Sequence, residues 1–386
     1  MLLHTCGRLI SLLGQIVIAS PAPRWTRYVR RLVLLAVVFP LFVLAQMLHW
    51  IGFALDEILF RGYRRIRIER PVFVIGVPRS GTTFMHRLLA ANPAFTTFST
   101  WECLFAPSIT ERCLIRALSS LDRRVGRPLG RCLDLLERKA LSRAASVHPT
   151  GLRLPEEDYL CFLPVLCCFI LILPFPEAKW VWRMAHFDQA VPSKERDRLL
   201  RWYRRCLQKH LYFHGQDRVL LSKNASFAGM AGSLIDAFPD CRLVVCRRDA
   251  LATIRSQFNS LKGSMRLFGI APDDARFRDR LVDAMDFYYR NIENATSRLP
   301  DDRLVRTDLP TLSTQTRQVI RELFAQFSLE YPPAVDDAVT ASEAAHESVG
   351  QASAGNRHDS LEFFGLNRAE LDIRFRRWCR YQPVGA

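Results

Sequence analysis

Short apolar runs alternate along this chain with longer segments in which apolar residues recur at helical spacing. The apolar runs, rich in Val, Ile and Leu, cover residues 72–77, 219–221, 243–246 and 304–306. The helical patterns cover residues 84–91, 111–148, 194–214, 273–298 and 314–327. Strands that alternate with helices pair in parallel, because each helix returns the chain to the same edge of the sheet. The pattern therefore predicts an α/β fold with a central parallel sheet flanked by helices.

Two further segments have less regular patterns. Residues 162–176 form a Pro-bounded apolar block that is too short to span a membrane reliably. The sequence leaves three predictions open for this block: a second membrane contact, the wall of a pocket, or part of the core. Residues 331–356 are rich in Ala, Ser, Glu and Asp, which predicts a loose, partly helical connector.

Residues 1–70 are predicted to form a membrane-associated appendage, ahead of one large domain that covers residues 71–386. No charged residue lies between Leu32 and Leu55, and a helix of this length covers about 30 Å of hydrocarbon. Basic residues flank the stretch on both sides, so the positive-inside rule gives no orientation. Both flanks reach the same side if Pro40 breaks the stretch, which then dips into the bilayer and returns, or lies in the interface. The alternative is a buried helical hairpin of a soluble protein.

Composition narrows the choice of partners. The chain has 386 residues, with 54 Lys and Arg against 38 Asp and Glu, a net charge of +16. Such an excess favours nucleic acid, acidic lipid headgroups or a polyanionic cofactor. No zinc-finger spacing, RNA-binding signature or heptad run is present, so nucleic acid is not a predicted partner. The 11 Cys are scattered, several of them inside apolar runs, which indicates reduced thiols rather than a disulfide framework.

The segment 71–91, PVFVIGVPRSGTTFMHRLLAA, has the order strand, tight loop, helix. Such a loop presents consecutive backbone N–H groups and the positive end of a helix dipole, and Gly81 allows the main chain to approach an anion closely. Gly76 and Gly81 have the spacing that opens a P-loop, but Thr82 stands where that motif has Lys, and the cation is Arg79, inside the loop. The segment predicts a phosphate-like ligand and weakens the case for an ATPase or GTPase.

Residues 78–89, PRSGTTFMHRLL, resemble the 5′-phosphosulfate-binding loop of the sulfotransferases that use 3′-phosphoadenosine 5′-phosphosulfate (PAPS), especially the bacterial branch and its tyrosylprotein relatives. A second block, residues 238–261, lies at the distance that this family shows. The resemblance implies that Arg248 and Ser256 hold the 3′-phosphate. The chemistry agrees, because Arg offers a fork of donors and a Ser in the following helix adds a hydroxyl. The resemblance runs from about residue 71 to the C-terminus and implies a P-loop-like sulfotransferase fold.

The resemblance also implies roles for other residues. The phosphosulfate is held by loop residues, which are here Arg79, Ser80, Gly81, Thr82 and Thr83. Lys223 precedes Arg248 at the interval of the lysine that stabilises the leaving oxygen in the tyrosylprotein relatives, where a fixed cation is worth several kcal/mol. In several relatives a basic loop near the C-terminus closes over the 3′-phosphate, which makes Arg357 a candidate.

Three sets of side chains are candidates for acid–base or positioning roles. Glu102 is the predicted general base, because several relatives have a Glu at about this distance after the loop and a carboxylate there can take the acceptor proton. His86, on the first helix after the loop, is the competitor. Glu156, Glu157 and Asp158 resemble the P-x-E-D pattern of bacterial sulfotransferases. This cluster either positions an acceptor or an Arg, or begins a helix, and both roles stay open.

The predicted reaction is in-line transfer of a sulfuryl group from PAPS to a hydroxyl or amine of an acceptor, without a metal. The apolar N-terminal segment favours a lipophilic acceptor, either a small molecule or a lipid. A P-loop kinase or NTPase is the first alternative, but the 243–246 run ends in two Arg where such enzymes have an Asp for Mg²⁺. A non-catalytic, membrane-bound anion-binding protein is the second, and it leaves the two cofactor blocks unexplained.

The predicted location is a membrane, with the catalytic domain on the cytoplasmic face, where bacteria make PAPS. The alternative is a eukaryotic type II arrangement with the domain in the Golgi lumen. The glycosylation sequons at Asn224 and Asn294 have meaning only in that second arrangement.

Overall fold

The computed structural model describes residues 1–18, 25–144, 151–350 and 359–379. Five parallel strands form its sheet, in the order β2-β3-β1-β4-β5. The strands are β1 (Val72–Gly76), β2 (Phe95–Thr96), β3 (Val219–Lys223), β4 (Arg242–Arg247) and β5 (Leu304–Asp308). In the register at the centre, Val74 of β1 lies opposite Lys223 on one side and Val244 on the other. The predicted α/β fold with a central parallel sheet is confirmed.

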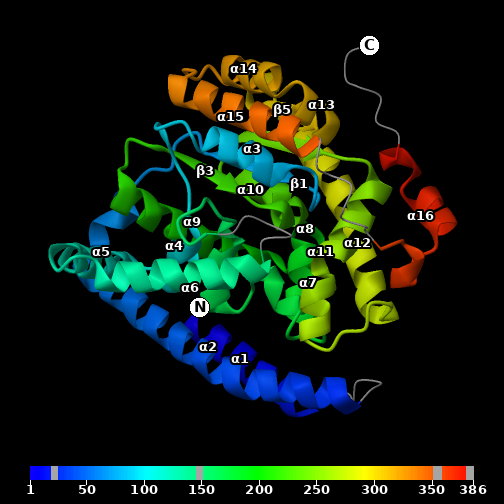
Figure 1. Cartoon of the computed structure of the whole chain (residues 1–386), viewed down its shortest axis with the longest axis horizontal. Coiled ribbons are helices and arrows are strands. Elements are labelled where there is room, and N and C mark those ends of the chain that lie inside the picture. The colour runs from blue at the N-terminus through cyan, green and yellow to red at the C-terminus, as the bar shows by residue number, and fades with distance from the viewer. Residues whose placement is uncertain (19–24, 145–150, 351–358, 380–386) are drawn as a thin grey trace.

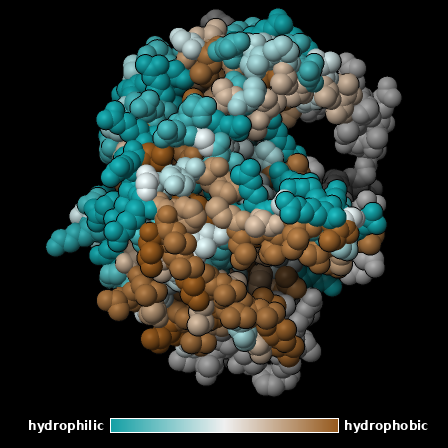
Figure 2. Space-filling view, turned by 90° about the vertical axis from the view of Figure 1, so that its left-hand side faces the viewer, coloured by the Kyte–Doolittle hydropathy of each residue, from teal (hydrophilic) through white to brown (hydrophobic). Residues whose placement is uncertain are grey.

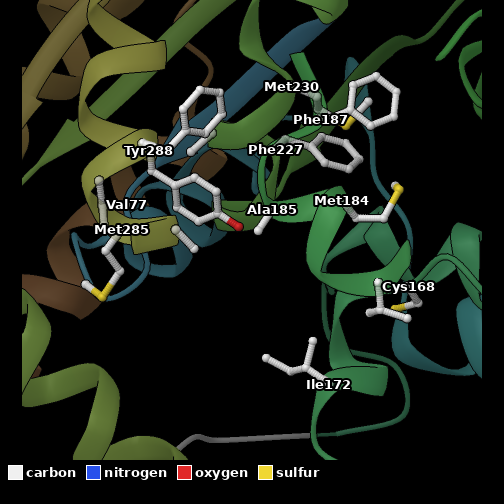
Figure 3. Packing of buried hydrophobic residues seen from close by; sticks show 14 of the residues in the cluster. Val77, Cys168, Ile172, Met184, Ala185, Phe187, Phe227, Met230, Met285 and Tyr288 are labelled. Carbon is white, nitrogen blue, oxygen red and sulfur yellow. The ribbon is translucent and has the colours of Figure 1, made fainter. Parts of the chain in front are cut away.

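Successive residues of β1 point to opposite faces of the sheet, and each face has its own helical layer (Figure 1). Val72 and Val74 pack with α3, α13, α14 and α15 on the upper face. Phe73 and Ile75 belong to a larger cluster on the lower face, with α7, α9, α10, α11 and α12. Figure 3 shows part of this larger cluster, including Phe227 and Tyr288. Both faces of the sheet are therefore covered, as an all-parallel sheet requires.

The helices connect the strands and extend the lower layer. Those before β3 are α1 (Leu2–Ile18), α2 (Trp25–Leu59), α3 (Thr82–Leu89), α4 (Thr100–Phe105), α5 (Ile109–Arg124), α6 (Pro128–Ala144), α7 (Lys179–Ala185), α8 (Phe187–Ala190) and α9 (Ser193–His214). Those after β3 are α10 (Ala231–Ala237), α11 (Ala250–Leu267), α12 (Ala275–Thr296), α13 (Leu309–Thr314), α14 (Thr316–Gln326), α15 (Pro333–Gly350) and α16 (Arg368–Arg374).

Short 3₁₀ helices form several of the connections. They are η1 (Arg61–Arg65), η2 (Asp158–Val165), η3 (Phe169–Ile172), η4 (Ala225–Met230), η5 (Asp301–Arg303), η6 (Glu362–Phe364) and η7 (Arg376–Trp378). The apolar block 162–176 thus forms parts of η2 and η3, and most of its side chains are buried. Its place in the protein is core and pocket wall.

The helix α2 runs without a break through Pro40, at the lower end of the molecule (Figure 1). The prediction that Pro40 breaks this stretch is wrong. A proline removes one backbone hydrogen bond, but Leu35 and Phe39 are buried against the protein on the same turns and hold the helix together. By length and composition, Leu35–Leu59 could cross a membrane. Because Leu35 and Phe39 join the same core cluster as the sheet, α2 packs directly on the following domain.

Candidate active site

The carboxyl ends of the parallel strands meet at one edge of the sheet and surround a cavity of about 500 Å³. The loop after β1, Glu157 and Arg248 all line this cavity. β1 is the central strand, and its neighbours β3 and β4 lead to opposite edges of the sheet. Ligands of open α/β sheets bind at such a switch point, outside the carboxyl ends of the strands.

The loop between β1 and α3 is shaped for a close approach to an anion. Arg79 and Gly81 both have left-handed backbone angles, with φ of 73° and 93°. A Cβ on Gly76 would lie 2.4 Å from the carbonyl oxygen of Cys246, and a Cβ on Gly81 would lie 2.8 Å from Leu309 Cδ1. Only glycine fits these two places. Because α3 begins directly after Gly81, its free N–H groups face the loop.

Two arginines and a serine, all predicted to bind the cofactor, lie together beside this loop. Arg248 donates a hydrogen bond to the backbone oxygen of Arg79 at 3.0 Å, and Arg79 Nε donates to Ser256 Oγ at 3.1 Å. Burial lowers the pKa of Arg79, and the charge of Arg248 lowers it further. Burial also lowers the pKa of Arg248. Two arginines forced together at the mouth of one cavity make a strong site for a phosphate or sulfate group.

Lys223, at the end of β3, connects the loop with a carboxylate of the opposite wall. Its Nζ donates to Glu157 Oε1 at 2.7 Å and to Thr83 Oγ1 at 3.1 Å. Glu157 and Thr83 both line the cavity. The structure therefore brings together Lys223, the loop and Glu157, the member of the acidic cluster whose role the sequence left open.

The neighbouring Asp158 has a different environment. It is fully buried and accepts a hydrogen bond from Tyr203 at 2.5 Å, and burial raises the pKa of Asp158 to about 7. Tyr203 in turn lies 3.2 Å from the hydroxyl of Ser222, the residue before Lys223. Asp158 thus anchors the segment that carries Glu157 to β3.

Glu102 lies outside the cavity, in contrast to its predicted role as general base. It caps the first turn of α4 and accepts hydrogen bonds from the backbone and side chain of Ser99. Its other oxygen lies 3.4 Å from Arg112 and 2.6 Å from His214. Burial alone would raise the pKa of Glu102, but Arg112, His210 and His214 outweigh it and hold the pKa well below its usual range. A carboxylate in such surroundings is a poor proton acceptor.

One group of side chains in the described residues is close enough together to hold a metal ion, and it includes Glu102. Side-chain atoms of Glu102, His210 and His214 lie within 4.8 Å of one another. Arg112 donates to His210 Nδ1 at 3.3 Å and also pairs with Glu102. The buried guanidinium thus supplies the positive charge that balances Glu102, and the cluster joins α4, α5 and α9.

His86, the competing base, is also absent from the cavity wall. It is fully buried on α3, and its Nε2 lies 2.7 Å from the hydroxyl of Thr97. Burial lowers the pKa of His86 well below its usual range, and Lys223 and Arg87 add to the effect. The geometry gives His86 a packing role, in which it connects α3 to the segment before α4.

The remaining predicted cofactor-binding residues are Thr82, Ser80 and Arg357. Thr82 lines the cavity, and the buried hydroxyl of Ser80 has no hydrogen-bond partner within the part of the chain that the structure describes. Arg357 lies outside the described residues.

The apolar block 162–176, which the sequence left open as a membrane contact, a pocket wall or core, supplies most of the apolar wall of the cavity. This wall is formed by Phe169, Ile170, Ile172, Leu173 and Leu281. Tyr288 is fully buried on α12 within the cluster that Figure 3 shows, outside the residues that line the cavity, and its hydroxyl has no hydrogen-bond partner among the described residues. Burial raises the pKa of Tyr288, and the charge of Glu157 adds to the rise. The sequence pointed to the apolar block 162–176 and to the acidic cluster before η2, but not to Leu281.

Comparison with known proteins agrees with this geometry. Residues 71–333 match the model of the sulfotransferase family. The fold is similar to that of the sulfotransferase STF1 from Mycobacterium tuberculosis H37Rv, with a TM-score of 0.67 and 16% identity over 96% of this chain and 92% of that one. It is also similar to the sulfotransferase STF9 from Mycobacterium avium, with a TM-score of 0.66 and 19% identity over 95% and 88%. No curated protein matches the chain.

At these identities the two crystal structures show a common fold and no more. The family match covers well over half of the chain and includes the loop after β1, Lys223 and Arg248. On that ground, the protein belongs to the sulfotransferase family.

Proposed function

We propose that this protein transfers a sulfuryl group from PAPS to a hydroxyl, or an amine, of a lipophilic acceptor. One observation carries the proposal: the loop after β1, Arg248 and the carboxylate of Glu157 line one cavity, and Lys223 contacts both Glu157 and Thr83 of its wall. An enzyme for such a transfer needs an anion cradle, a cation at the leaving oxygen and a proton acceptor.

The donor has two anionic ends, and the site has two matching regions. The loop, with the N-terminus of α3 and Arg79, fits the phosphosulfate, since Gly76 and Gly81 allow the tight, left-handed backbone path that presents the loop N–H groups. The unpartnered hydroxyl of Ser80 offers a further donor there. Arg248 and Ser256, on the other side of Arg79, fit the 3′-phosphate. Arg357 stays a predicted contact to the same phosphate.

In the proposed reaction, the acceptor oxygen attacks sulfur, and the bond between sulfur and the bridging phosphate oxygen breaks. Adenosine 3′,5′-bisphosphate leaves, and the acceptor proton moves to a carboxylate. We assign this carboxylate to Glu157, because it lines the cavity, whereas Glu102 is buried elsewhere. Lys223, which contacts both Glu157 and Thr83 at the start of α3, is placed to stabilise the charge on the leaving oxygen.

The apolar wall supports a lipophilic acceptor. Phe169, Ile172 and Leu173 line the cavity on the side of η3. Just after η3, the ring of Phe175 contacts that of Phe39 on α2, with 5.6 Å between the ring centroids. An acceptor with an alkyl or ring portion would bury it against this wall while its hydroxyl points to Glu157.

We also propose that the cavity faces the cytoplasm, because bacteria make PAPS there. Asn224 is fully buried, and its side chain accepts a hydrogen bond from the backbone of Ser226, so a glycan has no room there. This burial argues against a luminal, glycosylated form, although Asn294 is exposed. Mass spectrometry of the protein made in a eukaryotic secretory host would show an unmodified Asn224.

The direct test uses ³⁵S-labelled PAPS and a series of alcohols of increasing chain length, with glucose as a polar comparison. We expect labelled sulfate esters whose yield increases with chain length, and loss of transfer in Glu157→Gln. Failure of every acceptor together with no consumption of PAPS would overturn the proposed function. Loss of activity in Glu102→Gln but not in Glu157→Gln would return the proton-accepting role to Glu102.

A further inference from the structure

The outer side of α2 is apolar from Val33 to its end. Exposed apolar residues recur there at every third or fourth position: Val33, Val37, Leu41, Leu44, Leu48, Ile51, Leu55 and Ile58. This spacing places them along one side of the helix, and at 1.5 Å per residue the stripe is about 38 Å long. We call these eight residues the apolar face. A helix on the surface of a water-soluble protein shows the opposite pattern, with polar residues outside.

The hydrophobic surface extends beyond α2. At the same lower end of the molecule, α1 exposes Leu3, Ile10 and Leu13 (Figure 1). Figure 2 shows hydrophobic residues gathered over the lower part of the molecule, while the upper part is largely hydrophilic. A contiguous apolar surface of this size marks a contact with a membrane or another protein.

Polar contacts hold α2 along its length against the rest of the protein. Asp56 is fully buried and pairs with Lys209 of α9 at 2.8 Å, and it also accepts hydrogen bonds from the first N–H groups of α5. His49 Nδ1 lies 2.6 Å from Glu111, and Trp50 donates to the backbone oxygen of Pro164 at 3.0 Å. To cross a bilayer, α2 would have to break these contacts and expose Asp56 and His49 to lipid, at a large cost. The helix therefore lies along the surface of the protein.

A group of exposed arginines lies just after the end of α2. Arg61, Arg64, Arg65 and Arg67 follow directly after the apolar face. Basic residues next to an apolar surface match the phosphate groups of anionic lipids that lie above the acyl chains. A second copy of this chain would bring the same arginines and the same net charge of +16, which disfavours it as the occupant.

We propose that the apolar face is a monotopic docking surface for an anionic lipid bilayer. α2 lies in the plane of the interface, the apolar face is buried among the acyl chains, and the arginines after it contact lipid phosphates. The docking does not depend on the proposed chemistry. It brings the chain just after the η3 wall of the cavity near the bilayer, because Phe175 there contacts Phe39 of α2.

The first test compares matched substitutions by flotation with vesicles. Leu41 on the apolar face and Ile373 on α16 are exposed to similar extents, 64% and 67%. We expect full-length wild type and Ile373→Glu to float with vesicles of phosphatidylcholine and phosphatidylglycerol. Leu41→Glu should bind these vesicles at least about tenfold more weakly than wild type. Equal binding of Leu41→Glu and Ile373→Glu, or no binding by wild type, would overturn the proposal.

The second test measures charge and depth. The double variant Arg65→Glu/Arg67→Glu should lose binding to the mixed vesicles and keep its binding to pure phosphatidylcholine. In a further variant, Leu48→Trp, added indole fluorescence should be quenched by lipids brominated on the acyl chain, while Ile373→Trp should not respond. Unquenched fluorescence of Leu48→Trp, or a stable dimer in sedimentation velocity that Leu41→Glu dissociates, would contradict the bilayer as occupant.

Discussion

The surroundings of Glu157 and Glu102 show how two similar carboxylates acquire different roles. Each is paired with a cation, Lys223 for Glu157 and Arg112 for Glu102. Glu157 lines the cavity and shares Lys223 with Thr83. Glu102 is enclosed by Ser99, Arg112 and two histidines. A carboxylate with room for a substrate can take a proton, whereas one with all its lone pairs satisfied holds helices together.

The largest expected effect separates these two carboxylates in catalysis. Glu157→Gln should lower kcat by about 10²–10⁴-fold, the usual contribution of a general base. Its affinity for adenosine 3′,5′-bisphosphate should stay within about threefold of wild type, since the carboxylate does not contact the nucleotide in the proposal. Single-turnover transfer from ³⁵S-labelled PAPS measures the first quantity and calorimetry the second. A larger loss of kcat in Glu102→Gln than in Glu157→Gln would reverse the comparison.

For stability the expected order is reversed: replacing Glu102 should cost more free energy of unfolding than replacing Glu157. Glu102→Ala leaves Arg112 buried without its carboxylate partner, and losing one member of a buried ion pair costs about 3–5 kcal/mol. Glu157 is partly exposed, so water can reach Lys223 after Glu157→Ala, and the loss should be smaller. Urea unfolding of both variants gives the free energies. Equal losses would mean that Glu102 is not the structural member of the two.

A third comparison concerns two glycines with positive φ. Gly81 lies in the loop with φ of 93°, and Gly126 lies in the α5–α6 turn with φ of 86° and open space around it. Gly81→Ala should weaken bisphosphate binding by about tenfold, because a strained backbone costs on the order of 1–3 kcal/mol and the new Cβ meets Leu309. Gly126→Ala should destabilise the fold slightly and leave affinity unchanged. Equal affinities in calorimetry would argue against the loop as the anion cradle.

The last comparison is a pH dependence of stability at Asp158. Its pKa is about 7 in the folded protein against an ordinary value of 3.8, so the folded state binds a proton that the unfolded state has released between these values. Stability therefore falls as pH rises through this window and levels off above it. Asp158→Asn removes this contribution. The free energy of unfolding of the variant, relative to that of wild type, should therefore be about 2 kcal/mol higher at pH 8 than at pH 5. A constant difference in urea unfolding at the two pH values would contradict the assignment.

The sheet was readable from the sequence because four of its strands are buried on both faces and need continuous apolar runs. Their ends were not readable, since Lys223, Arg247 and Asp308 continue their strands beyond the apolar run. β2 escaped prediction because two residues, Phe95 and Thr96, show no periodicity.

The helical segments show a similar limit. A break at Pro40 is expected from local propensity and would bring both basic flanks to one side, but packing of its neighbours overrides that propensity. The stretch predicted as a loose, partly helical connector is more helical than expected, since α15 extends over Pro333–Gly350.

The proposed anion-binding residues could be grouped from the sequence because they stand next to strand ends. In a parallel sheet these ends share one edge, so Arg79, Lys223 and Arg248 meet whatever the details of the connections. The choice between Glu102 and Glu157 depends on the path of the chain from α3 to α7. That path consists of short helices, and no local pattern records which carboxylate turns to the cavity.

The most direct test of the account is calorimetric binding of adenosine 3′,5′-bisphosphate and of ATP with Mg²⁺ to wild type and to Arg248→Ala. The account predicts tight binding of the bisphosphate, weak binding of ATP, and a loss of about tenfold to a hundredfold for the bisphosphate in Arg248→Ala, as expected for a charged hydrogen-bond donor. Preference for ATP, or equal bisphosphate affinity in wild type and Arg248→Ala, would contradict the claim that this cavity binds the sulfuryl donor.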